Sequence, residues 1–145
     1  PTKINKAVFP GLQGGPHENQ IAAVAVALKE AQSSSFKKYA KQVILNAKTL
    51  AEELKRLGWR IVSGGTDSHL VLVDVNKNGI SGKEAESLLE KNEIIINKNA
   101  IPFDKRKPTN PSGIRLGVAA ETTRGAKERD FIKIARRIDQ ILRKA

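Results

Sequence analysis

The chain has 145 residues, of which 39 % are hydrophobic, so it has the size of one typical domain and can form a packed core. Cysteine is absent and there are only two histidines, which excludes disulfide and thiolate chemistry and leads us to expect no metal site. No apolar run approaches the roughly 20 residues of a membrane span, and the first residues lack the apolar core of a signal peptide. We therefore expect a cytoplasmic protein with no membrane contact.

The formal net charge of +11 favours an anionic partner such as nucleic acid, phosphate or a polycarboxylate. A solvated surface explains the charge equally simply, because Lys and Arg are spread from Lys3 to Lys144 without a dense basic block. One Trp, one Tyr and four Phe leave few side chains on which bases could stack. The composition therefore favours the solvated surface over a nucleic-acid partner.

The first part of the sequence predicts a loop followed by two helices. Residues 1–17 are interrupted by glycines and prolines and are expected to be irregular. Residues 18–32 are rich in alanine and contain no breaker, which predicts a helix that packs closely against a neighbour. Residues 35–57 carry apolar side chains at intervals of three and four, which predicts an amphipathic helix ending at Gly58.

The rest of the sequence alternates between strands and helices. Apolar or β-branched runs predict strands at residues 59–62, 70–74, 94–96 and 113–118. Ser81 and Glu84 have the spacing of a capping box, which predicts a helix to about residue 91, and residues 126–142 predict a last amphipathic helix. Residues 97–112 read as a proline-rich loop. The order predicts an α+β fold, with helices packed on a small mixed or antiparallel sheet.

Two polar segments could contact ligands. Gly14 and Gly15 lie in a glycine-rich run before a predicted helix, where backbone N–H groups can approach a phosphate, although a plain connection is the commoner use of such a run. Asn97, Lys98 and Asn99 follow a predicted strand, and an asparagine amide could bind the edge of a heterocycle. A simple polar loop is the alternative for the second segment.

Arg115 is the residue of greatest functional interest. It is a single cation between Gly113 and Gly117 in a strand-like segment that is otherwise apolar. A guanidinium in such surroundings needs a partner, and its planar fork is the usual receptor for a carboxylate. The alternative is a structural arginine that pairs with an internal Asp or Glu, and spacing alone favours that alternative.

Six runs of the sequence are informative when they are taken together. They are residues 7–16 (AVFPGLQGGP), 62–67 (VSGGTD), 69–74 (HLVLVD), 97–102 (NKNAIP), 112–117 (SGIRLG) and 122–125 (TTRG). In their order and spacing, over nearly the whole chain, these runs resemble the serine hydroxymethyltransferase family. Two local departures are Val118-Ala119, where the family usually has Thr-Pro, and His17-Glu18-Asn19, where it often has Met or Asn with His nearby.

The resemblance implies the aspartate-aminotransferase-like fold of pyridoxal 5'-phosphate (PLP) enzymes, known as fold type I. Residues 1–33 would end the large PLP-binding domain, and residues 34–145 would form the small C-terminal domain. The implied reaction interconverts serine and tetrahydrofolate with glycine and 5,10-methylenetetrahydrofolate in one-carbon metabolism. The implied assembly of the full-length enzyme is a homodimer or a tetramer.

The resemblance also assigns roles to individual residues. Arg115 would bind the α-carboxylate of serine or glycine, and Asn99 would contact the pterin ring of the folate. Gly14 and Gly15 would offer N–H groups to the cofactor phosphate across the dimer interface. The Schiff-base lysine of the family would lie upstream of Pro1, so no catalytic residue is assigned and we expect the isolated chain to be inactive.

Two other interpretations stay open at this point. One is a basic α+β module that binds nucleic acid, and the other is a different enzyme of the aminotransferase fold that shares the small domain. The Asn97-Lys98-Asn99 run argues against the second, because other members have no folate to bind. The positive surface could also attract polyglutamylated folate.

Overall fold

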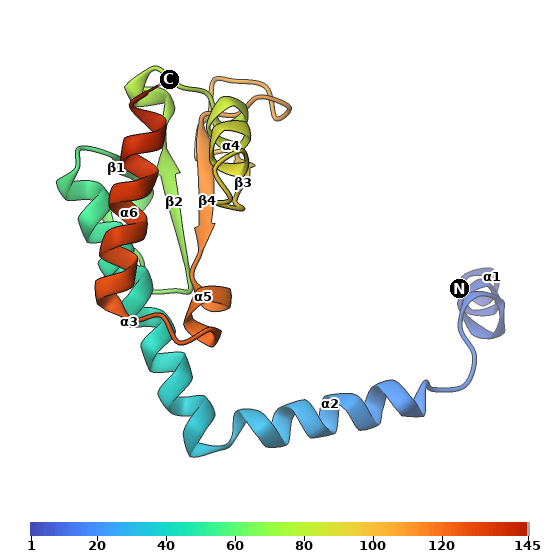
Figure 1. Cartoon of the computed structure of the whole chain (residues 1–145). Coiled ribbons are helices and arrows are strands. Elements are labelled where there is room, and N and C mark those ends of the chain that lie inside the picture. The colour runs from blue at the N-terminus through green and yellow to red at the C-terminus, as the bar shows by residue number, and fades with distance from the viewer. Residues whose placement is uncertain (145) are drawn as a thin grey trace. The chain divides into compact units, whose positions relative to one another are not determined.

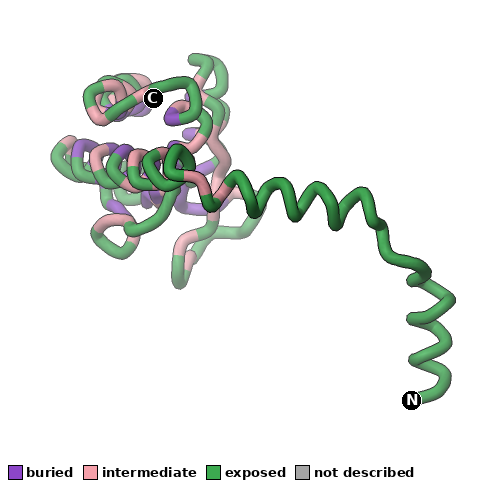
Figure 2. Tube along the Cα trace, turned by 90° about the horizontal axis from the view of Figure 1, so that it is seen from below, coloured by how far each residue is buried: buried purple, intermediate pink, exposed green. Residues whose placement is uncertain are grey.

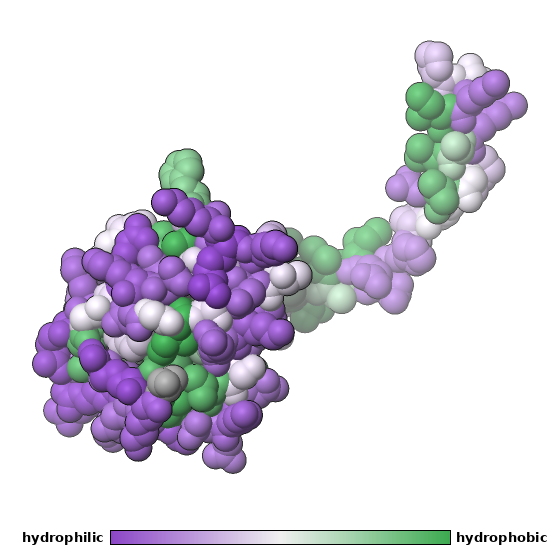
Figure 3. All heavy atoms as spheres, turned by 90° about the horizontal axis from the view of Figure 1, so that it is seen from above, coloured by the Kyte–Doolittle hydropathy of each residue, from purple (hydrophilic) through white to green (hydrophobic). Residues whose placement is uncertain are grey.

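The computed structural model describes residues 1–144 and divides the chain into two compact units, Pro1–Lys37 and the residues from Lys38 onwards (Figure 1). In this part of the chain, no helix combines the length and the apolar character that crossing a membrane requires. The surface of the second unit is mostly hydrophilic in the view of Figure 3, with a few hydrophobic groups.

The first unit contains two α-helices, α1 (Thr2–Lys6) and α2 (Glu18–Ala31), joined through a π-helical turn at Ala7–Leu12. The prediction of a loop is therefore wrong for residues 2–8, which contain no breaker. At Phe9 and Pro10 the backbone is not helical, as the predicted break at Pro10 requires. Residues 1–30 are all exposed, as Figure 2 shows. The predicted packing of α2 is thus not made within this unit, and Leu28 remains 60 % exposed.

The second unit contains a four-stranded sheet in the order β1-β2-β4-β3. Its strands are β1 (Arg60–Ile61), β2 (Leu70–Asp74), β3 (Asn97–Asn99) and β4 (Gly113–Gly117), and every neighbouring pair is antiparallel. Consecutive side chains of a strand point to opposite faces of a sheet. In β2 and β4 the inward face is buried and the other face is more open. The predicted α+β class is confirmed.

Three helices cover the buried face of this sheet: α3 (Ser34–Arg56), α4 (Gly82–Glu90) and α6 (Glu128–Leu142) (Figure 1). Their apolar sides and the inward side chains of the strands form one core, which appears as the buried stretches in Figure 2. Large buried side chains of this core include Leu50, Leu54, Trp59, Val71, Val73, Leu89, Ile114, Leu116, Phe131, Ile138 and Leu142. Most of the stabilisation by burial is therefore local to this unit.

The helix ends follow the predicted signals. Ser81 Oγ accepts a hydrogen bond from Glu84 N (3.2 Å), and Glu84 Oε2 accepts one from Ser81 N (2.8 Å), so the capping box is confirmed. Gly58, which has φ +93°, follows α3 as the predicted glycine cap. The sequence did not predict α5 (Ala119–Thr123), a single short turn of helix after β4. The buried Asn46 anchors this turn by donating to Thr122 Oγ1 (2.9 Å).

The predicted strand at residues 94–96 is wrong. These residues follow the turn that ends α4, and Ile94 N donates to Leu89 O (2.9 Å) instead of to a strand. Ile94 and Ile96 pack against the core, whereas Ile95 is 79 % exposed. The residues that pair with β4 are Asn97–Asn99, the beginning of the segment predicted to be a loop. The β-branched run therefore indicated packing and not hydrogen-bond pairing.

Candidate functional site

The face of the sheet opposite the core carries the candidate site. We call it the open face, and alternate positions of the strands lie on it: Arg60, Leu70, Leu72, Asp74, Asn97, Asn99, Gly113, Arg115 and Gly117. Residues directly opposite each other on antiparallel strands project to the same face. Arg115 is opposite Leu72 on one side and opposite Asn97 on the other. The strand register thus brings together Arg115 and both predicted asparagines.

Arg115 is exposed and is not part of an internal ion pair. Its only side-chain hydrogen bond within residues 1–144 runs from Nε to Asn97 Oδ1 (3.0 Å), and none of their carboxylates lies within ion-pair distance of it. The alternative of a structural arginine paired with Asp or Glu is therefore wrong for this part of the chain. The terminal Nη groups are available to an external anion.

Asn99 lies two residues from Asn97 on the same strand and is half-buried. Its Nδ2 donates to Ala100 O (2.6 Å), and its Oδ1 accepts no hydrogen bond from the described residues. An amide oxygen that is fixed in this way can accept a hydrogen bond from a ligand. Asn99 therefore remains a candidate for binding a heterocycle.

Gly113, the first residue of β4, allows neighbouring segments of the chain to come unusually close to the strand. A Cβ on Gly113 would lie 2.6 Å from Ile101 Cγ2 and 2.9 Å from Asn99 O. A Cβ on Gly82, the first residue of α4, would lie 2.2 Å from the carbonyl oxygen of Gly113. Because both approaches involve backbone atoms, α4, β3 and β4 can meet here only where no side chain intervenes. This contact fixes the strand that carries Arg115.

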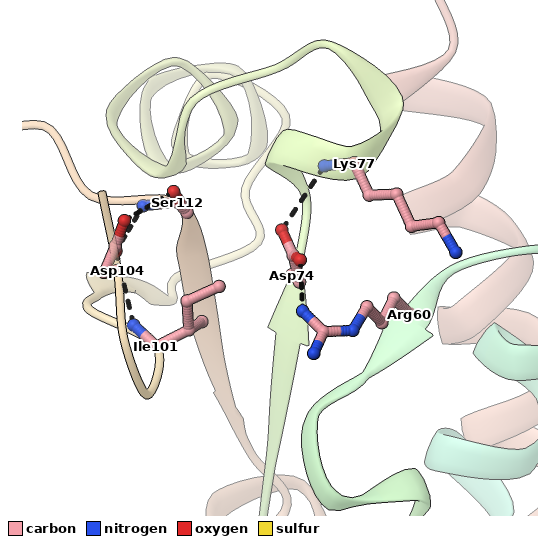
Figure 4. Close-up of polar contacts among 6 residues, drawn as sticks. All are labelled: Arg60, Asp74, Lys77, Ile101, Asp104 and Ser112. Carbon is pink, nitrogen blue, oxygen red and sulfur yellow. Dashed lines mark hydrogen bonds and ion pairs between the residues drawn. The ribbon is translucent and has the colours of Figure 1, made fainter. Parts of the chain in front are cut away.

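The Asp104 carboxylate closes the connection between β3 and β4 (Figure 4). It accepts hydrogen bonds from Ser112 Oγ (2.6 Å), Ser112 N (2.9 Å), Arg106 N (2.9 Å) and Ile101 N (3.3 Å). Burial alone would raise the pKa of Asp104, but these hydrogen bonds outweigh it and lower the pKa to about 2. The sequence carries no signal for this residue, because Ser112, which donates two of the four hydrogen bonds, lies eight positions away across the loop.

We predict that Asp104 stabilises the fold only where it is ionised. Its folded pKa is depressed from 3.8 to about 2, so its contribution is complete above about pH 4 and is lost as the pH falls towards 2. The free energy of unfolding of wild type and Asp104→Asn should therefore differ at pH 7 and converge between pH 4 and pH 2. Urea denaturation at a series of pH values measures this difference. A difference that stays constant across that range would contradict the role of the carboxylate.

Arg60 and Asp74 form an ion pair near the same end of the sheet (Figure 4). Arg60 Nη1 lies 2.6 Å from Asp74 Oδ2, and Lys77 N donates to Asp74 Oδ1 (3.3 Å). Asp74 is only 7 % exposed, so this pair joins β1 to β2 and to the turn after β2. Unlike Arg115, Arg60 already has its carboxylate, and it is not a candidate receptor.

Gly14 and Gly15 lie in the first unit, between the π-helical turn and α2. No heavy atom lies within 4 Å of the position that a Cβ would take at either residue, and their N–H groups donate to no acceptor in the described chain. The His17 side chain does not cap α2, so the first N–H groups of this helix are also free of a side-chain acceptor. Free N–H groups before and at a helix N-terminus are suited to a phosphate. The residues present therefore fit the phosphate of PLP.

Other kinds of site have little support in the described part of the chain. Residues 1–144 contain no group of three or more His, Asp or Glu side chains that could hold a metal ion.

Asn97 is a functional candidate that the sequence did not single out from its neighbours, because its contact with Arg115 depends on the register of β3 against β4.

A comparison with protein families covers the residues of this site. The family model described as serine hydroxymethyltransferase matches residues 1–138, which is nearly the whole chain. The matched region includes the glycine-rich segment, both asparagines of β3 and the strand that carries Arg115. The chain is therefore a member of the serine hydroxymethyltransferase family.

Proposed function

We propose that this chain is the C-terminal part of a PLP-dependent serine hydroxymethyltransferase. The reaction converts serine and tetrahydrofolate into glycine, 5,10-methylenetetrahydrofolate and water, and it is reversible. The observation that carries the proposal is Arg115, an exposed guanidinium beside two asparagines on the open face of the sheet, in a chain of this family. Its Nη groups have no partner among residues 1–144. A planar, permanently charged fork with no internal partner is suited to the α-carboxylate of an amino acid.

In this proposal Arg115 binds and orients the substrate. Two parallel hydrogen bonds to one carboxylate define the position of the attached α-carbon and limit its rotation. Holding a reactant in one orientation lowers the barrier by removing the entropy of alignment. Arg115 therefore contributes by positioning and takes no part in proton transfer, because a guanidinium offers N–H donors and no acceptor atom.

Gly14 and Gly15 would hold the phosphate of PLP through their free N–H groups. When bound, PLP supplies an electron-withdrawing ring that makes bonds at the substrate's α-carbon easier to break. None of the lysines in this chain matches the family's covalent anchor for PLP. We therefore propose that the isolated chain has no turnover of its own.

The folate would lie against β3, where Asn99 offers its unpaired Oδ1 to an N–H group of the pterin ring. The wider proposal follows the family: a homodimeric or tetrameric cytoplasmic enzyme of one-carbon metabolism that uses serine, glycine and tetrahydrofolate. The exposed apolar side chains of α2, including Leu28, are consistent with an assembly that covers them.

The test uses two proteins: the 145-residue chain, and a complete enzyme in which residues 1–145 replace the matching C-terminal part of a serine hydroxymethyltransferase. Formation of methylenetetrahydrofolate from serine is followed with a coupled dehydrogenase. We expect turnover by the complete enzyme and none by the chain alone. Turnover by the isolated chain would refute the proposed inactivity, and an inactive but folded, PLP-loaded complete enzyme would refute the proposed reaction.

A further inference from the structure

We propose that Asn97 is a positioning residue that turns Arg115 so that it binds a carboxylate through its two terminal Nη groups. The substrate meant here is the amino acid of the proposed function, and the inference rests on that function for its role in turnover. The geometry itself rests on contacts within the second unit. It therefore has a test of its own.

The register of the sheet places Asn97 beside Arg115. Asn97 is directly opposite Arg115 on the neighbouring strand, and both side chains project to the open face. Asn97 Oδ1 accepts a hydrogen bond from Arg115 Nε at 3.0 Å. This contact joins the first residue of β3 to the single cation of β4.

Asn97 itself is fixed. Its Nδ2 donates to Lys98 O (2.8 Å), which leaves Oδ1 to face Arg115. Lys98 N in turn donates to Glu86 Oε1 (3.0 Å), and Lys98 Nζ lies 2.5 Å from Glu86 Oε2. Glu86 belongs to α4, so the strand that carries Asn97 is anchored to a helix of the core. A partner anchored in this way reduces the entropy that Arg115 loses on binding.

The planar guanidinium offers a carboxylate more than one edge. A carboxylate can bind it side-on, through Nε and one Nη, or end-on, through both Nη groups. Asn97 occupies Nε, so the end-on edge is the one that remains fully available. Asn97 therefore selects one of two binding orientations for the same charge pair.

The side chain that Asn97 offers to Arg115 is a neutral amide. A carboxylate at position 97 would accept the same Nε hydrogen bond, but it would also neutralise Arg115 and compete with the substrate. The Asn97→Asp substitution is nearly isosteric, so it separates this electrostatic effect from a loss of packing. An amide retains the hydrogen bond while leaving the positive charge available.

The contact can be tested in the unmodified chain by NMR of the arginine side chains. The Nε–H of Arg115 should exchange with water at least about threefold more slowly than that of Arg129, an exposed arginine without a hydrogen-bond partner among residues 1–144. The difference should disappear in Asn97→Ala. Addition of sodium acetate should shift the Nη resonances of Arg115 and leave its Nε–H protected. Equal exchange of the two arginines in wild type, or loss of the protection on adding acetate, would overturn the inference.

The role in turnover is tested in the complete enzyme. Asn97→Asp should raise KM for serine by roughly tenfold or more while kcat changes much less, because the lost interaction is one of ground-state binding. Asn78→Asp is the matched control: it adds the same charge at an exposed turn, and its side chain has no hydrogen-bond partner in the described chain. An unchanged KM in Asn97→Asp would overturn the inference. Protected Nε–H in an inactive complete enzyme would instead refute only the proposed reaction.

Discussion

Serine turnover by the complete enzyme is expected to fall by roughly 30- to 5,000-fold in kcat/KM when Arg115 is replaced by alanine. This range corresponds to about 2–5 kcal/mol, the usual cost of removing one partner from a desolvated charge pair. The expectation follows from the exposed guanidinium, whose Nη groups have no partner in the described chain. Arg115→Lys should retain some binding because the charge remains, but it should lose the bidentate geometry and fall between wild type and alanine.

Arg129→Ala provides the control for this measurement. Arg129 is an exposed arginine of α6 that makes no side-chain hydrogen bond within residues 1–144, so its loss removes the same charge from another surface. Steady-state kinetics with serine as the varied substrate distinguish the variants, and circular dichroism checks that each is folded. If Arg115→Ala retained the kcat/KM of wild type, Arg115 would not be the carboxylate receptor.

Gly113→Ala is expected to destabilise the second unit by about 1–3 kcal/mol, the usual cost of adding a methyl group to a packed site. The new Cβ would lie 2.6 Å from Ile101 Cγ2, 2.9 Å from Asn99 O and 3.0 Å from Val73 O. Two of these three atoms belong to the backbones of neighbouring strands, which cannot move aside without disturbing the sheet. The strain should therefore appear as a lower free energy of unfolding and as shifted backbone resonances of Asn99.

Gly117→Ala is the matched control for this prediction. Gly117 lies on the same strand, on the other side of Arg115, and no heavy atom lies within 4 Å of the position of its Cβ. The substitution should change the free energy of unfolding by less than about 0.5 kcal/mol. Urea denaturation of the two variants compares them directly. Equal stability of the two would mean that the close approach at Gly113 is relieved by small movements.

The hydrophobic pattern was sufficient to predict the helices that form the core. Leu50 and Leu54 recur at helical spacing and are buried in α3, and Ser81 caps the start of α4 through the capping box that its sequence indicated. The β-branched pattern did not predict the structure of residues 94–96, where Ile94 and Ile96 pack on the core but the backbone joins no strand. Pairing depends on a partner strand, which a local pattern does not contain.

The sequence predicted which residue types form the candidate site, but not how they are arranged. Arg115 could be identified directly from the sequence, because it is the single charged residue in an apolar strand-like segment and a buried charge needs a partner. The contribution of Asn97 could not be read in this way, because it depends on which β3 residue is opposite Arg115. Asp104 was missed for a related reason: its partners become neighbours only after the loop has folded.

The bond between Lys98 N and Glu86 also affects how the protein behaves among other copies of itself. β3 is the last strand of the sheet, and a free edge is a template for pairing with a strand of another molecule. Here the N–H group of the central residue of β3 is already bonded to a helix carboxylate, and the ammonium of the same residue neutralises that carboxylate. An incoming strand would have to break both interactions, so this edge is protected against aggregation by the contact that also anchors Asn97.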